Sequence, residues 1–361
     1  MDAHAFGELT SAHGPFASVH FDDSHHSEDS DKQLRLRIKE ITTALADQGA
    51  DAETVDALVR AIEDAPPPVG ESGRSLIAAQ GTVLLDHRLT APPPELIVRY
   101  SALPYLVPLA SHEAEWPPHV VVVADSVGAE ITRHSRHGTH TETVSGSDHP
   151  VHTVRGGGTA HKDLQNRTEE TAKQNLAKIA DAVGKAAGRI GAEIVVLAGE
   201  VQTRSALQDL LPESVRRITT TVEGSSRTES SDELGSQVTE LLLSRHLTDL
   251  DDLAERFRAE TGRESGLAVS GLTGVTAALS EASVATLLIG EPGDAVVFTG
   301  PEPAQVGTDG TRLDALGVPE PSRHRADEAL PYAAVATGAD VVVMDERLPL
   351  PDGFGAILRH S

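Results

Sequence analysis

The sequence predicts a protein of several domains that combines the α+β and α/β fold classes. Its 361 residues exceed the roughly 250 to 300 residues that one hydrophobic core usually serves. A helical hairpin followed by short β-rich runs indicates an α+β domain, and strands that alternate with helices farther along indicate mixed or parallel sheets. We therefore predict three domains, at residues 1–115, 116–228 and 229–361.

The first predicted domain begins with a strand at residues 16–21, followed by an acidic loop. A helix is predicted at residues 31–48, because apolar residues recur at helical spacing from Leu34 to Leu45 and Gly49 suits its end. A second helix at residues 51–64 stops at three prolines, because proline lacks an amide donor and clashes with the preceding turn. Four β-rich runs complete the domain, at residues 75–79, 82–86, 96–100 and 105–109.

The second predicted domain starts with a continuous apolar strand at residues 120–124, which pairs with residues 127–132 across a tight turn. A long helix near His161 carries one apolar face. Strands and a helix then alternate, which predicts a mixed, largely parallel sheet flanked by helices. The later elements are a strand at 194–198, a helix to Leu211 and a strand at 217–222.

A charged helical segment at residues 232–260 leads into the third predicted domain. This domain has the α/β pattern, with a helix at residues 273–279 and a Pro/Gly-rich loop at residues 300–321. Its predicted strands lie at residues 267–269, 285–289, 296–298 and 341–344.

Composition narrows the classes of function. The chain has no cysteine, which excludes disulfides and thiolate metal sites, and its formal net charge of -25 repels polyanions at long range. Seven basic and four acidic residues between Arg155 and Arg189 nevertheless give that segment a local charge of +3. No stretch approaches the 18 or so apolar residues of a membrane span. We expect a cytoplasmic protein that could meet RNA locally but not DNA or a membrane.

Three stretches resemble the class one release factor and Pelota superfamily of eukaryotes and archaea. Val154-Arg155-Gly156-Gly157-Gly158 follows a hydrophobic hairpin and precedes a basic helix, where that family has Arg-Gly-Gly-Gln. The strand Ala192–Gly199 ends in a Leu-Ala-Gly turn like the family's, and Gly355–Arg359 is similar to the Ala-Ile-Leu-Arg terminus of the family's last domain. The best likeness is to the bacterial branch that includes the ribosome hibernation factor Balon.

The resemblance implies a ribosome-binding factor. The middle domain would have a ribonuclease H-like fold, and the last domain would have the fold of the kink-turn-binding ribosomal proteins. The first domain would occupy the decoding side of the A site, although the family's Asn-Ile-Lys-Ser loop for stop codons has no counterpart here. The loop would reach the ribosomal RNA of the peptidyl-transferase centre. By likeness to Balon, the GTPase partner would be elongation factor Tu, and the role would be in hibernation or stress.

The glycine run is the centre of the candidate site. Glycines lack Cβ atoms, so their backbone can approach RNA closely, although a bare run of three is also typical of a flexible connection. Gly158 has no side chain to place an attacking water, so the resemblance implies binding without hydrolysis. The candidate residues are Arg155, Gly156, Gly157, Gly158, His161 and Lys162, with Arg167 and Lys173 as further basic residues that face RNA.

Other functions have weaker support from the sequence. Six histidines at positions 134, 137, 140, 149, 152 and 161 fit no compact ligand motif in a loop-like stretch, so we expect no metal and no cofactor. A nuclease would use Asp125 with Glu142 or Asp181, but Asp125 is better explained as a turn residue. The enzymatic alternative is a peptidyl-tRNA hydrolase for ribosome rescue that uses Gln165. A protein unrelated to ribosomes is the third possibility.

Overall fold

The computed structural model describes residues 7–25, 29–68, 71–125, 127–145, 159–223, 231–263 and 266–360. The chain forms two compact units. One unit combines Met1–Glu115 with Arg245–Ser361, and the other is Trp116–Ser244. The predicted first and third domains thus lie largely within one unit, and the division into three domains stays a prediction. The long helix α8 (Ser231–Thr261) starts in the second unit and ends in the first.

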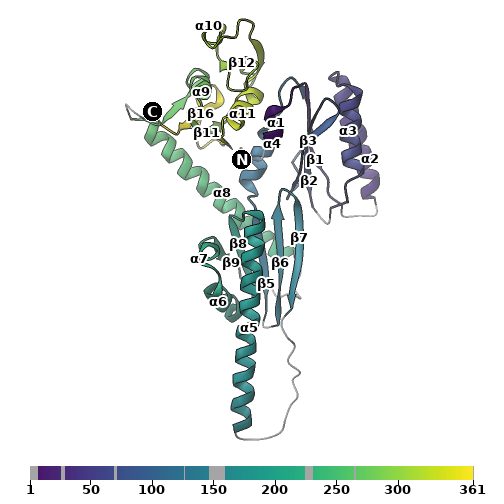
Figure 1. Ribbon diagram of the computed structural model, residues 1–361, viewed down its shortest axis with the longest axis vertical. Coiled ribbons are helices and arrows are strands. Elements are labelled where there is room, and N and C mark those ends of the chain that lie inside the picture. The colour runs from purple at the N-terminus through teal and green to yellow at the C-terminus, as the bar shows by residue number, and fades with distance from the viewer. Residues whose placement is uncertain are drawn as a thin grey trace. The chain divides into compact units, whose positions relative to one another are not determined.

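The N-terminal segment is built on an antiparallel sheet with the strand order β3-β2-β1-β4. Helices α2 and α3 pack on one face of this sheet, where Ile41, Leu45 and Leu58 bury against Val19 and Leu76 (Figure 1). The elements are α1 (Gly7–Ser11), β1 (Phe16–Asp22), α2 (Ser30–Asp47), α3 (Ala52–Glu63), β2 (Gly73–Ala79), β3 (Thr82–Leu89), β4 (Ile97–Ser101) and α4 (Val107–Glu115).

The predicted strand at residues 105–109 is wrong, because the chain forms helix α4 there. Leu106, Leu109 and Ala110 are all buried at spacings of three and four residues, which is the periodicity of a helix face. Pro108 falls in the first turn, where a helix needs no amide donor. In the sequence, a short apolar run with one proline is compatible with a strand or with a helix. The burial of Leu106, Leu109 and Ala110 on one side favours the helix.

The other face of the N-terminal sheet shares a core with the C-terminal segment. Phe16 and Leu106 belong to the same buried cluster as Leu330 and Phe354. The ring of Phe16 lies 6.4 Å from the ring of Tyr332, centroid to centroid. Apolar side chains of both segments therefore leave water together, which explains why they form one compact unit.

An ionic cluster joins β4 to the start of α11 in the same unit. The Arg99 guanidinium donates to Asp327 at 3.1 Å and to Glu328 at 3.3 Å, and it lies 3.4 Å from the centre of the Tyr105 ring. Arg325 donates to Asp327 at 2.9 Å. Both carboxylate residues are only 4% exposed. Burial raises the pKa of Glu328, while the nearby charge of Arg99 lowers it.

The C-terminal segment has a four-stranded sheet with the order β10-β16-β11-β15, in which β11 and β15 run parallel. A second, small sheet has the order β13-β12-β14. The elements are β10 (Ala268–Ser270), α9 (Gly271–Ser280), β11 (Val284–Ile289), β12 (Val296–Thr299), β13 (Val306–Gly307), α10 (Gly310–Ala315), β14 (Ser322–Arg325), α11 (Ala326–Ala336), β15 (Asp340–Val343), the 3₁₀ turn η2 (Pro351–Gly353) and β16 (Phe354–Leu358).

The predicted loop at residues 300–321 is wrong in part, since it contains β13 and the six-residue helix α10. Asp309 caps that helix by accepting a hydrogen bond from the amide of Arg312 at 3.1 Å. Two strand residues and six helical residues are too few to show a period in the sequence.

The second unit contains a five-stranded sheet with the order β7-β6-β5-β8-β9. β5 pairs with β8, and β8 with β9, in parallel, whereas the β5–β6 and β6–β7 pairs are antiparallel. The sheet is mixed as predicted, but not largely parallel. Its elements are β5 (His119–Ala124), β6 (Gly128–Ser135), β7 (Gly138–Ser145), α5 (Thr159–Ile190), β8 (Ile194–Gly199), α6 (Val201–Leu210), α7 (Glu213–Arg216) and β9 (Thr219–Thr221).

Helices cover both faces of this sheet. Alternate residues of β5 point to opposite sides, so Val122 meets Val183 of α5 while Val123 belongs to the cluster that contains Leu242 of α8. Trp116 packs against that second cluster. The prediction of a multidomain protein of mixed α+β and α/β class, with a helix-flanked mixed sheet in its middle, is confirmed.

Candidate functional site

The predicted glycine-rich site lies between two well-defined elements of the second unit. β7 ends at Ser145, where it pairs with Gly128 of β6, and α5 begins at Thr159. Arg155, Gly156, Gly157 and Gly158 themselves lie outside the described residues. The structure thus defines the two elements that carry this segment, an edge strand and a helix, and the position of its residues stays a prediction.

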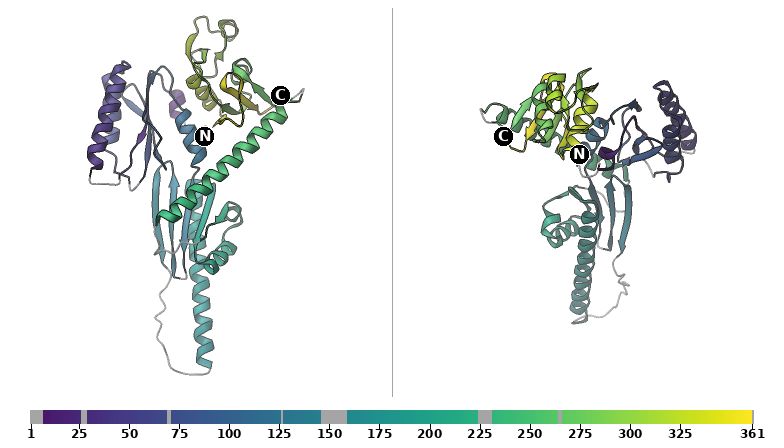
Figure 2. Two further views of the ribbon diagram at one scale, coloured as in Figure 1. Left: turned by 180° about the vertical axis from the view of Figure 1, so that it is seen from behind. Right: turned by 45° about the horizontal axis from the view of Figure 1, so that its top comes forward.

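Helix α5 is long compared with the sheet on which it packs. Its 32 residues correspond to about 48 Å at about 1.5 Å per residue, whereas an eight-residue strand spans about 27 Å. Ile179 and Val183 of its C-terminal half are buried against the sheet. Figures 1 and 2 show the N-terminal half running beyond the end of the sheet. The helix therefore carries its first turns away from the core of its own unit.

Four of the residues singled out from the sequence fall on this projecting half. His161, Lys162, Gln165 and Arg167 lie in α5, where the backbone is helical and their side chains are outside the description. Lys173 is exposed at the next described turns. The structure therefore places His161, Lys162, Arg167 and Lys173 on one helix that adjoins the glycine run, and what these residues contact stays a prediction.

On the described part of α5, the basic residues nearer the glycine-rich segment differ from those nearer the C-terminal end in whether they form ion pairs. Lys173 and Lys178 are exposed, and neither forms an ion pair with another described side chain. Nearer the C-terminal end, Lys185 pairs with Asp181 at 2.6 Å, and Arg189 lies 4.0 Å from Glu142 of β7. Among the side chains that the structure describes, the lysines of α5 nearest the glycine run are thus the ones without a carboxylate partner.

The histidine-rich stretch is a β-hairpin over residues 134–145, so its interpretation as loop-like is wrong there. The rings of His134 and His119 stack at 4.5 Å, and His134 Nδ1 is 3.1 Å from the Thr139 hydroxyl. Burial lowers the pKa of His134 to about 3, helped by the neighbouring His119. Burial also lowers the pKa of His119. Both rings are therefore neutral at neutral pH, and their role is packing.

No group of three or more His, Asp or Glu side chains among the described residues is placed to hold a metal ion. His149 and His152 lie outside those residues. Asp125 has the turn role that the sequence predicts, because its Oδ1 accepts hydrogen bonds from the amides of Val127 and Gly128, both at 2.8 Å. Its carboxylate is thereby committed to the β5–β6 turn.

The Leu-Ala-Gly sequence at the end of β8 needs glycine as its last residue. Gly199 has a φ of +106°, and a Cβ at this position would collide with the carbonyl oxygen of Ala124 at the end of β5. The amide of Glu200 also donates to that carbonyl, at 3.3 Å. The C-terminal ends of the parallel strands β5 and β8 thus lie in close backbone contact just before α6 begins.

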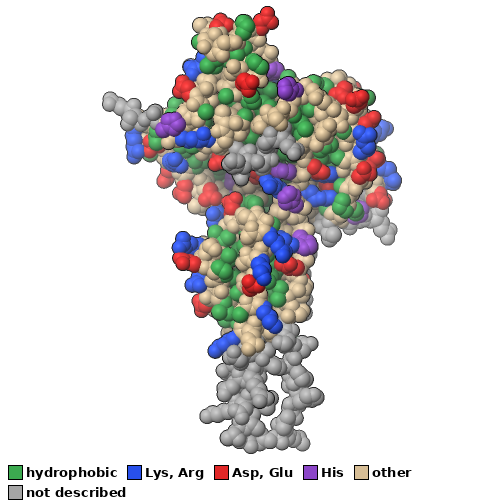
Figure 3. Space-filling view, viewed as in Figure 1, with side chains coloured by type: hydrophobic (Ala, Val, Ile, Leu, Met, Phe, Trp, Pro, Cys, Tyr) green, Lys and Arg blue, Asp and Glu red, His purple; other side chains and the backbone are tan. Residues whose placement is uncertain are grey.

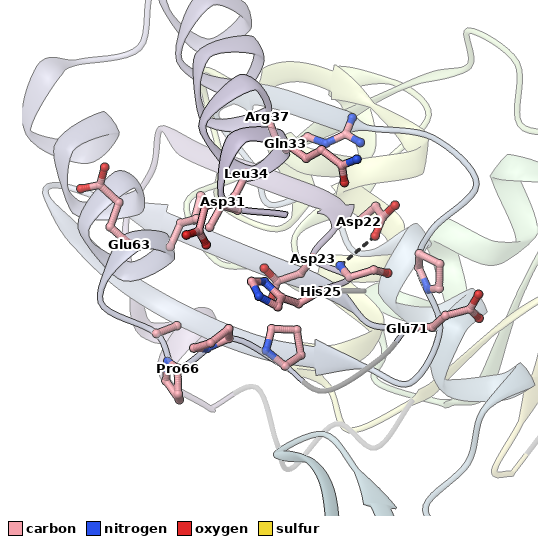
Figure 4. Close-up of a pocket in the computed structure, with 16 residues that line it drawn as sticks. Asp22, Asp23, His25, Asp31, Gln33, Leu34, Arg37, Glu63, Pro66 and Glu71 are labelled. Atoms are coloured by element: carbon pink, nitrogen blue, oxygen red, sulfur yellow. Dashed lines mark hydrogen bonds between the residues drawn. The ribbon is translucent and has the colours of Figure 1, made fainter. Parts of the chain in front are cut away.

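A second concave site, which the sequence did not indicate, lies in the first unit beside α2 and α3. The cavity has a volume of about 310 Å³, and its labelled carboxylates come from the end of β1, from both helices and from the segment before β2 (Figure 4). Asp23 lines it and also accepts from Arg88 at 3.3 Å. Burial raises the pKa of Asp23. Its acidic walls are Asp22, Asp23, Asp31, Glu63 and Glu71, with Arg37 and His25 beside them. Such walls disfavour a phosphate ligand.

No helix within the described residues is long and apolar enough to cross a membrane.

Comparison with known families gives a match in the middle of the chain. Residues 118–263 match the family model described as bacterial archaeo-eukaryotic release factor family 2. This range contains the whole five-stranded sheet, the glycine run and α5. The family match therefore falls on the part of the molecule that carries the candidate site.

The chain also matches two uncharacterized proteins of Mycobacterium tuberculosis, MT2704 of strain CDC 1551 and Rv2629 of strain H37Rv. Each is 36% identical over 356 residues, which cover 98% of this chain and 95% of the relative. Such identity along nearly the whole length means a common fold and a common family.

Solved structures with some likeness to this chain include an archaeal termination factor, a yeast termination-like factor and archaeal Pelota. An archaeal translation termination factor, aRF1, is 13% identical over 99% of this chain and 95% of its own, with a TM-score of 0.28. Saccharomyces cerevisiae Dom34 is 11% identical over 80% of each chain, with a TM-score of 0.42. Ribosome-bound archaeal Pelota is 12% identical over 99% of this chain and 94% of its own, with a TM-score of 0.42. Scores this low carry no argument by themselves.

Identity of 36% along nearly the whole chain shows that this protein belongs to one family with the two mycobacterial proteins. Its residues 118–263 match bacterial archaeo-eukaryotic release factor family 2, which supports a place in the bacterial branch of the release factor and Pelota superfamily.

Proposed function

We propose that this protein is a translation factor that binds the ribosomal A site and directs the segment between β7 and α5 toward the peptidyl-transferase centre. The observation that carries the proposal is the family match over residues 118–263, which coincides with the sheet and helix that hold this segment. Arg155, His161 and Lys162 would donate to ribosomal RNA phosphates, and the glycines would let the backbone approach closely.

The geometry of α5 supports such a reach. The helix projects beyond its sheet, and its exposed lysines nearest the glycine run, Lys173 and Lys178, have no described carboxylate partner. On a chain with a net charge of -25, these lysines and the basic residues nearer the glycine run give RNA a locally favourable approach along α5. Screening over roughly 8 Å keeps the acidic remainder of the chain from cancelling this local attraction.

The proposed factor binds without releasing the nascent peptide. Gly158 stands where the family's glutamine would be, and glycine has no side chain with which to position water at an ester. A non-hydrolytic occupant of the A site suits a hibernation or stress role, with the N-terminal segment on the decoding side. Elongation factor Tu or another translational GTPase would be its partner.

Co-sedimentation with vacant ribosomes across a salt series tests the proposal. We expect the wild type to pellet with ribosomes and Arg155→Ala/Lys162→Ala to bind about tenfold more weakly, because lost phosphate contacts reduce charge-assisted bonding. The slope of log affinity against log salt should fall by about one to two, roughly one per lost contact. Arg217→Ala/Arg263→Ala is the matched control, since both arginines are exposed and pair with acids, Glu213 and Glu260.

Three results would contradict the proposal. If the protein fails to pellet even at low salt, with or without elongation factor Tu, the ribosome is not its partner. If it releases peptide from loaded ribosomes and Gln165→Ala abolishes that release, the rescue hydrolase is the correct function. Equal loss in the double variant and its control would mean that only net charge matters.

A further inference from the structure

The exposed side of α2 carries a row of cations. Lys32, Arg35 and Lys39 are all exposed, and their spacings are three and four residues. At about 100° per residue these positions fall within an arc of about 60° on the helix. Thr43 and Ala46 continue the same side of the helix, so it carries no acid between Lys32 and Ala46. We call Lys32, Arg35 and Lys39 the α2 basic face.

The α2 basic face is unusual in so acidic a chain. The sequence has 55 acidic and 30 basic residues, so a surface cation usually finds a carboxylate nearby. Arg37 of the same helix does so, with Glu40 at 3.3 Å. Among the described residues, Lys32, Arg35 and Lys39 form no ion pair. Figure 3 shows Lys and Arg side chains along the edge where Figure 1 draws α2 and α3, with acidic ones interspersed.

The rest of α2 does not favour a membrane as the partner. A helix that lies on a membrane needs a broad apolar face toward the lipid. The apolar face of α2 is already used, since Ile41 and Leu45 are fully buried in the N-terminal core. Leu36, which is 55% exposed, is its only large exposed apolar side chain among the described residues. The positive charge itself is therefore the property that remains for recognition.

We propose that the α2 basic face binds the phosphate backbone of RNA. From Lys32 to Lys39 the helix rises about 10 Å, which matches about three phosphates at the roughly 3.4 Å axial spacing of one nucleic-acid strand. Lysine and arginine bind phosphates without reading bases, so the contact positions the N-terminal segment on RNA and does not select a sequence. That this RNA is ribosomal rests on the proposed function.

The test compares two variants with the same change of net charge. Lys32→Gln/Arg35→Gln/Lys39→Gln removes the α2 basic face, and Arg217→Gln/Arg245→Gln/Arg263→Gln removes three exposed cations that pair with acids elsewhere. Binding is measured to purified ribosomes by sedimentation and to a short labelled RNA duplex by anisotropy. We expect the first variant to lose about tenfold or more in affinity and about two to three in salt slope, and the control to lose little.

The outcomes separate this inference from the proposed function. If the α2 variant keeps wild-type affinity for ribosomes and RNA while Arg155→Ala/Lys162→Ala is impaired, the inference is wrong and the function stands. If no form pellets with ribosomes, the function is wrong, and the RNA duplex alone decides the inference. Loss of binding to anionic vesicles or of self-association, with RNA binding unchanged, would assign the face to a lipid surface or to a second copy and overturn the inference.

Discussion

At the scale of single residues, the stacked pair of His134 and His119 makes the second unit sensitive to acid. Burial lowers the pKa of His134 to about 3, from an ordinary value of 6.5, and lowers the pKa of His119. Below pH 6.5 these histidines therefore bind more protons in the unfolded chain than in the folded chain. The free energy of unfolding decreases as the pH is lowered. The contribution of the neutral pair is complete above about pH 6.5 and is lost as pH falls toward about 3.

The variant His134→Phe should resist acid better than the wild type. Phenylalanine keeps an aromatic ring against His119 but cannot be protonated, and exposed Thr139 can turn its hydroxyl to water. We expect the acid-unfolding midpoint to fall by roughly half a pH unit. Fluorescence of Trp116 reports on this unit, since it is the only tryptophan of the sequence and packs in the second unit. His140→Phe, at an exposed site in the same hairpin, should leave the midpoint unchanged.

At the scale of elements, the turn between β8 and α6 depends on one glycine. Gly199→Ala introduces a Cβ at a φ of +106° and against the carbonyl of Ala124, so the ends of β5 and β8 must separate. We expect a loss of roughly 2 to 4 kcal/mol in the free energy of unfolding. Urea denaturation followed by Trp116 fluorescence measures it. A loss below about 1 kcal/mol would show that the strands can relax.

Gly188 in α5 provides the opposite control. It lies in a helix, and a Cβ there would meet nothing within 4 Å. Alanine favours helix over glycine, so Gly188→Ala should stabilise the same unit by roughly 0.5 to 1 kcal/mol. Opposite signs for two glycine-to-alanine changes in one unit would separate backbone strain from a general effect of added methyl groups.

The elements that the sequence predicts best are those with one apolar face. α2, α3 and most of α8 show a clear stripe, and their predicted bounds agree with the structure within about two residues. Helix α11 is not predicted, because it is apolar, buried nearly all round and interrupted by Pro331. β7 is missed because its residues are mostly polar, with Val144 as its one large apolar side chain. Of the two elements that flank the candidate site, the sequence predicts α5 but not β7, and the loop between them lies outside the described residues.

At the scale of the whole molecule, the contacts between distant segments could not be predicted. Arg99 and Glu328 are 229 positions apart in sequence, and no pattern near either residue indicates that they meet. Both acids at the start of α11 are buried, so their charges are tolerated only while Arg99 and Arg325 lie beside them. The first unit therefore depends on an ion cluster as well as on its shared core.

Removing one side of this cluster should destabilise the first unit. Arg99→Met leaves two buried carboxylates with one fewer cation, and we expect a loss of about 2 to 4 kcal/mol, allowing for partial exposure of Arg99. Scanning calorimetry of the full chain measures it, and adding Glu328→Gln should restore part of the loss. Arg37→Met, which breaks an exposed pair with Glu40, should cost under about 1 kcal/mol. Equal losses of stability in Arg99→Met and Arg37→Met would mean that the lost packing of the arginine side chain, and not the ion cluster, causes the effect.

The division of the first unit into two sequence segments sets the order in which the chain can fold during its own synthesis. The second unit finds its partners within one continuous stretch, Trp116–Ser244. Phe16 and Leu106 must wait for Leu330, more than 200 residues later. At roughly 5 to 20 residues per second, that delay is about 10 to 45 s. The face of the first sheet opposite α2 and α3 is therefore where we expect chaperones to bind the nascent chain.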